Sequence, residues 1–445
     1  MKLLFSALLG LYFVLLAGTA HAVLNIEITQ GVEGAVPVAI VPFGWEVPPQ
    51  SAQMPTALTA PLKPPVDVAA IISADLARSG RFAPLPPKDM VARPHADTTI
   101  NFSNWRVFQT ENLVVGTLQY VGANRYKIRF RLFDVFKGKQ LEGVSLSASG
   151  NDLRRAAHQV SDIIYEKLTG ERGAFSTNVA YVTADGQGNA RRYSLWIADA
   201  DGHGAQSMMR SREPILSPAW SPDGTRIAYA SLEDAGHQVV FVQEVASGRR
   251  EKVSAQKGLN GAPAWSPDGQ SLAISLSKDG NAEIYVIDLK SKKQRRLTRH
   301  WAIDTEPAWM PDGKSIIFTS DRGGRPQLYR VPAMGGQAER LTFEGHSNAR
   351  ASVSSDGTKV AMIHRIDGHY RVAVMELSSG NLRVLTDGDL DESPSFSPNG
   401  SMVIYATSAR GRGILKAVSV EGGVQQRFTD TAGDVREPAW SPFMQ

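Results

Sequence analysis

The stretch Pro218–Gly224 reads PAWSPDG, and this heptapeptide recurs through the second half of the chain. Full or nearly full copies stand at Pro263–Gly269 (PAWSPDG) and Pro307–Gly313 (PAWMPDG). Looser copies follow at Ala351–Gly357 (ASVSSDG), Pro394–Gly400 (PSFSPNG) and Pro438–Pro442 (PAWSP). Successive copies begin 43 to 45 residues apart. A fixed period of this length indicates an architecture in which each repeat is one supersecondary unit.

Each copy except the last is followed by three more runs that are typical of strands, separated by glycine-rich turns. In two of the copies these runs are Leu272–Ser277, Ile284–Asp288 and Leu297–Thr298, and Ile316–Ser320, Leu328–Val331 and Leu341–Thr342. Four short strands per period predict one blade of a β-propeller. The Asp-Gly or Asn-Gly pair is expected to form a tight turn with positive φ. The aromatic residue of each copy is expected to pack between neighbouring blades: Trp220, Trp265, Trp309, Phe396 and Trp440.

The ends of the repeat region predict how the ring closes. Asn178–Thr183 and Leu195–Asp199 match the second and third strands of a blade, with no first strand before them. Pro438–Pro442 is a first strand with nothing after it. We therefore expect residues 177–445 to form an all-β six-bladed propeller that the C-terminal strand closes, which removes exposed sheet edges.

Residues 23–170 lack the repeat and alternate in element type, which predicts an α/β N-terminal domain. The expected elements are a buried strand at Val36–Phe43, a helix at Asp67–Ser79, a hairpin of Leu113–Tyr120 with Arg125–Phe133, and a helix at Leu153–Leu168 that Gly170 ends. The basic side of the second hairpin strand is interpreted as a solvated sheet face, because no aromatic residue alternates with its charges. Residues 171–176 are the expected linker.

The first 22 residues have the pattern of a cleaved signal peptide. Lys2 precedes an apolar run from Leu3 to Leu16, and the triplet Ala20-His21-Ala22 suits cleavage after Ala22. The apolar run is shorter than the roughly 20 residues that a membrane-spanning helix needs. The chain has no cysteine, which fits an oxidising compartment. We expect a secreted protein without direct membrane insertion.

The sequence offers little support for catalysis or cofactor binding. It contains no G-x-S-x-G nucleophile elbow, no H-E-x-x-H pair and no calcium-loop signature. His364 and His369, five residues apart, are interpreted as two surface residues rather than metal ligands. The net charge of +4 is spread along the chain, so nucleic-acid binding is not expected. These patterns favour a non-enzymatic binding protein that uses no cofactor and no metal.

The loops that lead into the innermost strands converge at the mouth of a propeller's channel, and this is the expected binding surface. The two residues before each copy of the repeat are Leu216 and Ser217, Gly261 and Ala262, Thr305 and Glu306, Ala349 and Arg350, Glu392 and Ser393, and Arg436 and Glu437. Three carboxylates and two arginines would then rim one opening, where charges steer and orient a partner.

Val23–Glu33 alternates apolar and polar residues, with Leu24, Ile26 and Ile28 on one side. This pattern is typical of a strand. The strand could join the sheet of the N-terminal domain, or it could stay free to add to the sheet of a partner.

Several segments together resemble the TolB family of the Tol-Pal envelope system from end to end. They are GVEGAVPVAIVPF (Gly31–Phe43), DLARSGRF (Asp75–Phe82), EKLTGERGAF (Glu166–Phe175) and the PAWSPDG blades. The resemblance implies a periplasmic protein that links the lipoprotein Pal with TolA, maintaining outer-membrane integrity and constriction during cell division.

The resemblance also implies two binding sites. Pal would bind at the propeller mouth, through Leu216, Ser217, Asn260, Gly261, Ala262, Thr305, Glu306, Glu392, Arg436 and Glu437. TolA would bind the mature N-terminus, through Val23, Leu24, Asn25, Ile26, Glu27 and Ile28. Other outer-membrane lipoproteins are further possible partners. The alternatives are a hydrolase or lactonase propeller with a metal in its channel, and a scaffold of outer-membrane protein assembly.

Overall fold

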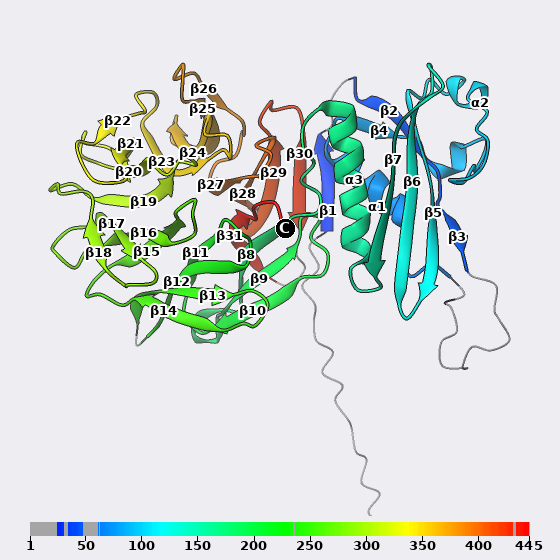
Figure 1. Ribbon diagram of the computed structural model, residues 1–445. Helices are drawn as coiled ribbons and strands as arrows, with labels where there is room; N and C mark the ends of the chain where they lie inside the picture. The colour runs from blue at the N-terminus through cyan, green and yellow to red at the C-terminus, as the bar shows by residue number, and fades with distance from the viewer. Residues whose placement is uncertain are drawn as a thin grey trace, which may run out of the picture.

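The computed structural model describes residues 25–30, 34–47, 61, 63–234, 236–429 and 433–444, and the side chains of residues 25, 29, 30, 189 and 429 fall outside that description. The predicted signal peptide, Val23 and Leu24 lie outside the described residues. Within these ranges the chain forms a six-bladed β-propeller with a smaller α/β unit beside it (Figure 1). The predicted fold class is therefore confirmed.

The six blades are antiparallel sheets arranged in a ring (Figure 1); five have four strands, and the sixth has a fifth strand, described below. The first blade combines β31 (Asp434–Trp440) with β8 (Asn178–Asp185), β9 (Arg192–Asp199) and β10 (Gln206–Ser211); the short helix η3 (Gly188–Ala190) joins β8 to β9. The second blade is β11 (Ile215–Trp220), β12 (Arg226–Asp234), β13 (His237–Glu244) and β14 (Arg250–Ser254). The third is β15 (Asn260–Trp265), β16 (Ser271–Leu276), β17 (Glu283–Asp288) and β18 (Gln294–Arg296).

The remaining three blades follow in chain order. The fourth is β19 (Asp304–Trp309), β20 (Ser315–Ser320), β21 (Gln327–Pro332) and β22 (Glu339–Arg340). The fifth is β23 (Ser347–Val353), β24 (Lys359–Ile366), β25 (His369–Glu376) and β26 (Leu382–Val384). The sixth is β27 (Glu392–Phe396), β28 (Met402–Ala409), β29 (Arg412–Ser419) and β30 (Gln425–Thr429).

The predicted turn and aromatic roles of the repeat are visible in its hydrogen bonds. In the turn after β11, the Ser221 hydroxyl donates to Asp223 Oδ1 at 2.5 Å, and the same oxygen accepts the Thr225 N–H at 3.0 Å. Gly224 has φ of 69°, which a side chain would disfavour. The indole N–H of Trp265 donates to the Ala219 carbonyl of the preceding blade at 3.0 Å. The repeat is therefore a folding unit in which the turn and the tryptophan stabilise different contacts.

The Leu-Thr runs are not themselves the fourth strands, which corrects that expectation. The fourth strand of the third blade ends at Arg296, before Leu297 and Thr298. The Thr298 hydroxyl accepts the Ile284 N–H at 3.0 Å and donates to Glu283 Oε2 at 2.6 Å. The side chain of Thr298 thus replaces a backbone partner of the neighbouring strand just past the end of β18. The strand-like pattern of the Leu-Thr run therefore marks the end of the fourth strand.

Closure of the ring also follows the prediction. β31 pairs antiparallel with β8, with Asp434 opposite Ala184 and Trp440 opposite Val179. The Ser441 N–H continues the ladder to the Asn178 carbonyl at 2.8 Å. The last strand of the chain is therefore the innermost strand of the first blade.

The N-terminal α/β unit has a sheet in the order β4-β2-β5-β6-β7, with β3 also paired to β5. Its strands are β2 (Val36–Ile40), β3 (Gly44–Glu46), β4 (Phe82–Pro84), β5 (Asn112–Gly122), β6 (Arg125–Asp134) and β7 (Lys139–Ser149). Its helices are α1 (Val68–Arg78), η2 (Pro87–Asp89), α2 (Ser103–Arg106) and α3 (Leu153–Thr169). Asp67 caps α1 by accepting the Ala70 N–H at 3.0 Å, and Gly170 ends α3 with φ of 78°.

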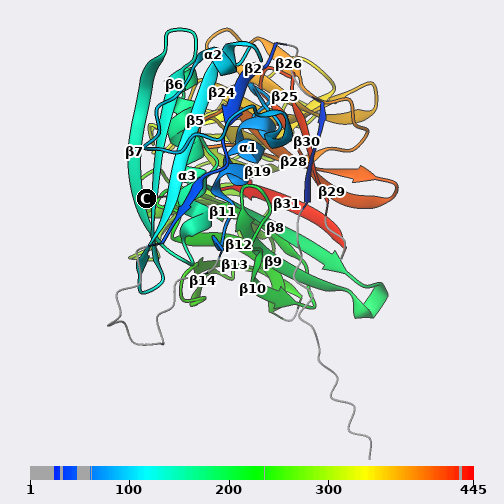
Figure 2. The same cartoon turned by 90° about the vertical axis from the view of Figure 1, so that its right-hand side faces the viewer.

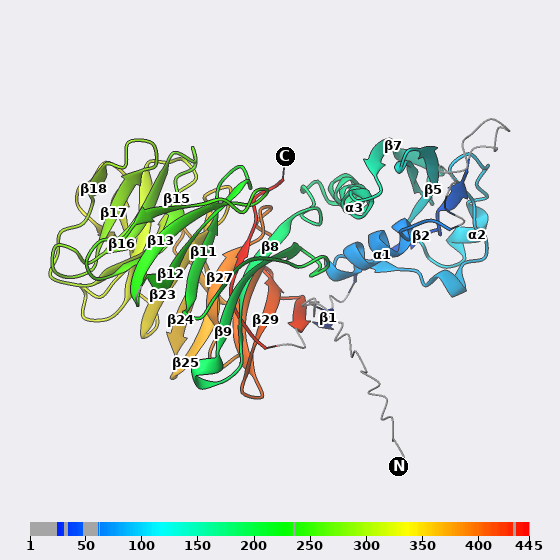
Figure 3. The same ribbon diagram turned by 90° about the horizontal axis from the view of Figure 1, so that it is seen from below.

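The basic side of β6 was predicted to be a solvated sheet face, and part of it forms ion pairs with carboxylates. Arg129 contacts Glu46 at 3.1 Å and Asp97 at 3.0 Å. The opposite side of β6 buries Ile128 and Phe130 in the core that α1 and α3 cover. Figure 3 shows both helices between the N-terminal sheet and the propeller.

Neither alternative for the N-terminal segment is what the structure shows. β1 (Asn25–Gln30) pairs antiparallel with β30, so it is the fifth strand of the sixth blade, and Figure 2 shows it alongside β30. Ile26 packs against the core shared by the sixth and first blades. The two predicted alternatives were a strand of the N-terminal sheet and a free segment. The physical reason for the difference is that the outer edge of β30 offers unpaired backbone groups, with which the alternating segment forms hydrogen bonds.

Candidate functional site at the propeller mouth

All six innermost strands carry the same backbone irregularity near the channel mouth. Each strand has a register shift of one residue against its neighbour, as between Leu216 and Ala219 in β11. At the same position of each strand a residue with a side chain has a φ of 47° to 56°: Ser217, Ala262, Glu306, Arg350, Ser393 and Glu437. We call these six residues the bulge ring. Bulges of this kind re-aim side chains and commonly lie at binding sites, where backbone strain is retained.

The bulge ring lines a channel cavity of about 370 Å³ together with the prolines and aromatic residues of the repeats. The ring contains two carboxylates, Glu306 and Glu437, and one guanidinium, that of Arg350. Glu392 adds a third carboxylate one residue before Ser393. With Arg436 as the second arginine of the rim, three carboxylates against two guanidiniums leave the mouth with one excess negative charge.

Arg350 reaches across the channel and joins several blades. Its Nε lies 3.1 Å from Glu306 Oε1 in the fourth blade, and its Nη2 lies 3.1 Å from Glu437 Oε2 in the first. It also donates to the Ser393 hydroxyl of the sixth blade and, at 3.4 Å, to the Ser217 hydroxyl of the second. Because Arg350 belongs to the fifth blade, one side chain links five of the six blades.

The carboxylates in turn hold the backbone of the ring. Glu306 Oε2 accepts the Arg350 N–H at 3.1 Å, and Glu437 Oε2 accepts the Ser217 N–H at 3.1 Å. Burial alone would lower the pKa of Arg350, but Glu437 and Glu306 outweigh it and raise the pKa above its ordinary value. The guanidinium stays charged, and the three charged groups fix the shape of the mouth.

The other predicted mouth residues differ in how far they are exposed to solvent. Leu216, Thr305 and Glu392 are half-buried on the innermost strands, Gly261 is buried beside Ala262, and Arg436 is exposed with its guanidinium 3.7 Å from Asp434. Asn260 differs, because its side chain is fully buried and its amide bonds Ser254, Gln256 and Gly258. Asn260 therefore supports the loop from inside, and its predicted contact with a partner stays a prediction.

The histidine pair also needs correction. His364 is 2% exposed rather than on the surface, and its Nδ1 lies 2.8 Å from Asn348 Oδ1. Burial lowers its pKa. His369 is half-exposed, and its Nδ1 lies 2.9 Å from Asp389 Oδ1. The two histidines have separate partners.

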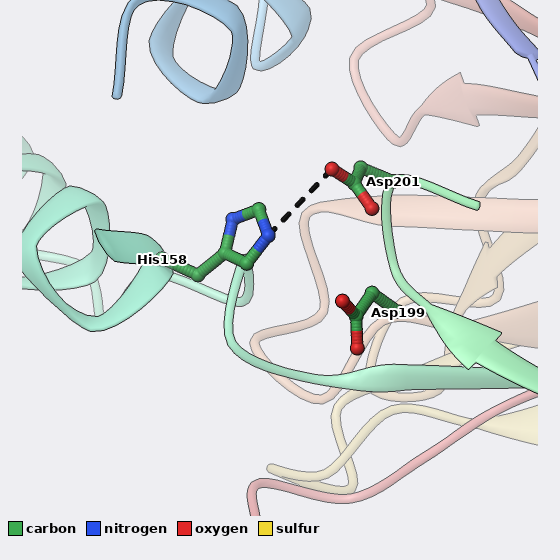
Figure 4. Close-up of side chains that lie close together, drawn as sticks. All are labelled: His158, Asp199 and Asp201. Atoms are coloured by element: carbon green, nitrogen blue, oxygen red, sulfur yellow. Dashed lines mark ion pairs between the residues drawn. The ribbon is translucent and has the colours of Figure 1, made fainter. Parts of the chain in front are cut away.

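A second charged cluster joins the two structural units, and nothing in the sequence pattern pointed to it. His158 of α3 lies close to Asp199, the last residue of β9, and to Asp201 in the loop that follows (Figure 4). Its Nε2 is 3.6 Å from Asp201 Oδ2, and its Nδ1 is 2.7 Å from Asp75 Oδ2. The spacing of the three groups would suit a cation. However, Arg154 contacts Asp201 and lies 3.7 Å from Asp199.

The positive charge in this cluster therefore comes from the protein itself. Arg78 adds a second guanidinium, 2.8 Å from Asp75 Oδ1. Burial acts to raise the pKa of Asp201, but Arg78, His158 and Arg154 outweigh it and lower that pKa. Burial raises the pKa of Asp199. We interpret the cluster as an ion network that holds α1 and α3 against the propeller.

Comparison with known proteins agrees with both parts of this architecture. Residues 24–141 match the family described as the TolB amino-terminal domain, and residues 165–444 match the TolB beta propeller domain. The chain belongs to the TolB family. The Tol-Pal system protein TolB of Thioalkalivibrio sulfidiphilus is 52% identical over 435 residues, which cover 98% of this chain and 97% of that protein. The protein of the same name from Nitrosococcus oceani is 52% identical over 425 residues, covering 95% and 94%.

A solved TolB structure shows the same fold. The crystal structure of TolB from Acinetobacter baumannii superposes with a TM-score of 0.84 at 41% identity and covers 94% of this chain and all of that one. The family membership makes this chain a component of the Tol-Pal system. No helix within the described residues is long and apolar enough to cross a membrane.

Proposed function

We propose that this chain is a periplasmic, non-catalytic adaptor of the Tol-Pal system that binds the lipoprotein Pal at the propeller mouth and TolA through its N-terminal segment. In this role it would help to maintain the outer membrane and its constriction during cell division. Full-length similarity to Tol-Pal system TolB proteins supports the system. The single observation that carries the binding site is the bulge ring, where six strained residues hold the same position around one opening.

The mouth suits recognition of a protein better than hydrolysis. A lactonase-type channel metal would need carboxylate ligands, but Glu306 and Glu437 are already paired with Arg350. The excess negative charge favours a partner that presents a cationic side chain to the channel. The preformed geometry favours binding, because little ordering is required on association.

The TolA part of the proposal involves β1. Glu27 and Ile28 are exposed on this strand, whereas Ile26 is half-buried against the propeller. β1 is the terminal strand of its sheet and pairs with β30 alone, so it can leave the blade by breaking one ladder. TolA would pair with this segment by strand addition, after the segment leaves β30.

Calorimetric titration of residues 23–445 with the soluble domain of the same organism's Pal tests the docking site. We expect one-to-one binding that Glu392→Arg weakens at least about tenfold, because a reversed charge at the mouth repels a cationic partner group. Glu339→Arg is the matched control, since Glu339 is 68% exposed on the outer strand β22. Equal binding by all three proteins would place Pal elsewhere, and no binding by the unaltered chain would refute the proposal.

A further inference from the structure

Large apolar side chains are exposed on three successive loops beside the mouth. Trp301 is 77% exposed and Ile303 53% exposed in the loop between β18 and β19. Phe343, between β22 and β23, is 72% exposed, and Leu390, between β26 and β27, is 47% exposed. We call these four residues the apolar arc. Each of the three loops leads into an innermost strand, so the arc lies on the same face as the bulge ring, over the fourth, fifth and sixth blades.

The arc is held in place by its own loops. The Asn281 side chain donates to the His300 carbonyl at 2.7 Å, and the Ile303 N–H donates to Asp321 Oδ1 at 2.8 Å. The His300 and Trp301 rings lie 5.1 Å apart. An exposed tryptophan on an anchored backbone loses little conformational freedom when it is covered.

The other two loops are anchored in the same way. Arg340 lies over the Phe343 ring at 5.0 Å from its centroid, and the Asn348 side chain donates to the Glu344 carbonyl at 2.8 Å. The backbones on both sides of Leu390 bond Tyr370, at 3.0 Å and 2.9 Å. Three preformed loops therefore present apolar groups towards solvent.

Exposure on this scale indicates a surface that another molecule covers. Single exposed apolar residues are ordinary, but an aromatic residue on each of two neighbouring loops, on the same face as a charged cavity, is typical of an interface. Tryptophan in particular dominates the binding energy of many interfaces. In contrast, the loops into the second and third blades, residues 212–214 and 255–259, have no large exposed apolar residue.

We propose that the partner at the mouth docks off the channel axis, with an apolar patch on the arc and a cationic side chain at the carboxylates of the bulge ring. This inference rests on the proposed function and commits to the soluble domain of Pal as the occupant. The arc supplies the apolar contact area, and the negative mouth sets the position of one charged group. Trp301 and Phe343 then determine the orientation of the partner.

Titration of the Pal domain into Trp301→Ala and Phe343→Ala tests the orientation. We expect each variant to weaken binding by about tenfold or more, as for aromatic residues at the centre of an interface. Met334→Ala is the matched control: Met334 is 81% exposed, but it lies in the turn between β21 and β22, on the opposite face. Its affinity should stay within about twofold of the unaltered chain. Thermal melts check that all three variants fold.

A second readout uses fluorescence. Trp301 should move to a less polar environment in the complex, so the emission of the chain should shift to shorter wavelength, and Trp301→Phe should lose that shift while it still binds. If both alanine variants bind like the control while Glu392→Arg does not, the off-axis arrangement is wrong but the mouth remains the docking site. If the unaltered chain does not bind Pal at all, both proposals fail.

Discussion

Replacing Arg350 with methionine should destabilise the propeller, because one guanidinium links five blades. Methionine keeps most of the length of the side chain but removes the charge and the donors. The variant leaves Glu306 and Glu437 without their partner in a mouth where the side chains of the two glutamates are 28% and 13% exposed. Two carboxylates of like charge then face each other across a narrow channel.

The magnitude follows from the burial of the three groups. Breaking an exposed ion pair costs about 0.2–1 kcal/mol, whereas breaking a buried pair costs about 3–5 kcal/mol. The Arg350 side chain is 26% exposed, which lies between these cases. We expect a loss of about 2 kcal/mol in the free energy of unfolding, measured by urea denaturation with tryptophan fluorescence as the signal.

Two companion variants make this measurement decisive. Arg383→Met removes a pair whose side chains are 52% and 74% exposed, so it should cost less than about 1 kcal/mol. Adding Glu306→Gln and Glu437→Gln to Arg350→Met should recover part of the lost stability, because no uncompensated charge remains. If Arg350→Met is as stable as Arg383→Met, the guanidinium does not hold the ring together and this reasoning is refuted.

Three more outcomes are expected. Asp201→Asn should lower the free energy of unfolding at pH 7 by about 1–3 kcal/mol, whereas Asp199→Asn should raise the melting temperature. Since the pKa of Asp201 is lowered in the fold, its contribution to stability is present above the unfolded pKa of about 3.9 and disappears as pH falls through the folded pKa. Thermal melts of both variants from pH 3 to 7 check the direction of each change. Removal of residues 438–445 should unfold the ring rather than trim it, because β31 is the innermost strand of the first blade, and a truncated chain with an unchanged melting curve would contradict the closure. Glu27 and Arg427 lie opposite each other on β1 and β30, and the chain has no native cysteine. The double variant Glu27→Cys with Arg427→Cys should therefore form a disulfide that blocks TolA binding until it is reduced. Binding that survives oxidation would show that β1 need not leave the blade.

Periodicity made the propeller predictable. The SPDG turn and the tryptophan act within one repeat or between adjacent repeats, so their roles follow from local sequence. The closing strand was equally accessible, because a first strand without successors and a second strand without a predecessor can be counted. Helices α1 and α3 were predicted for the same reason, since apolar spacing and, for α3, a terminal glycine are local signals.

The features that sequence could not give depend on contacts between distant segments. Arg350 lies in a strand where an arginine would ordinarily face solvent, and its acceptors come from four other blades. β1 found an edge about 400 residues away in the chain, which no alternation pattern can specify. β7 was missed because serines and a glycine interrupt its apolar alternation, although Val144, Leu146 and Ala148 pack on the core.

The apolar arc is an intermediate case. Trp301 and Phe343 stand in polar loops just after the Leu-Thr runs, where neither belongs to a strand pattern. An aromatic residue outside every expected strand was therefore a usable signal for an interface. Its exposure, however, could be established only once the loops were placed.

Hydrogen–deuterium exchange of the chain, with and without the soluble domain of Pal, tests most directly whether the propeller mouth is the docking site. The account predicts slower exchange in residues 299–306, 343–350 and 387–393, which form the arc loops and the strand starts beside the bulge ring, while the SPDG turns on the opposite face are unchanged. Protection of those turns or of the outer strands, with no change at the mouth, would contradict the account.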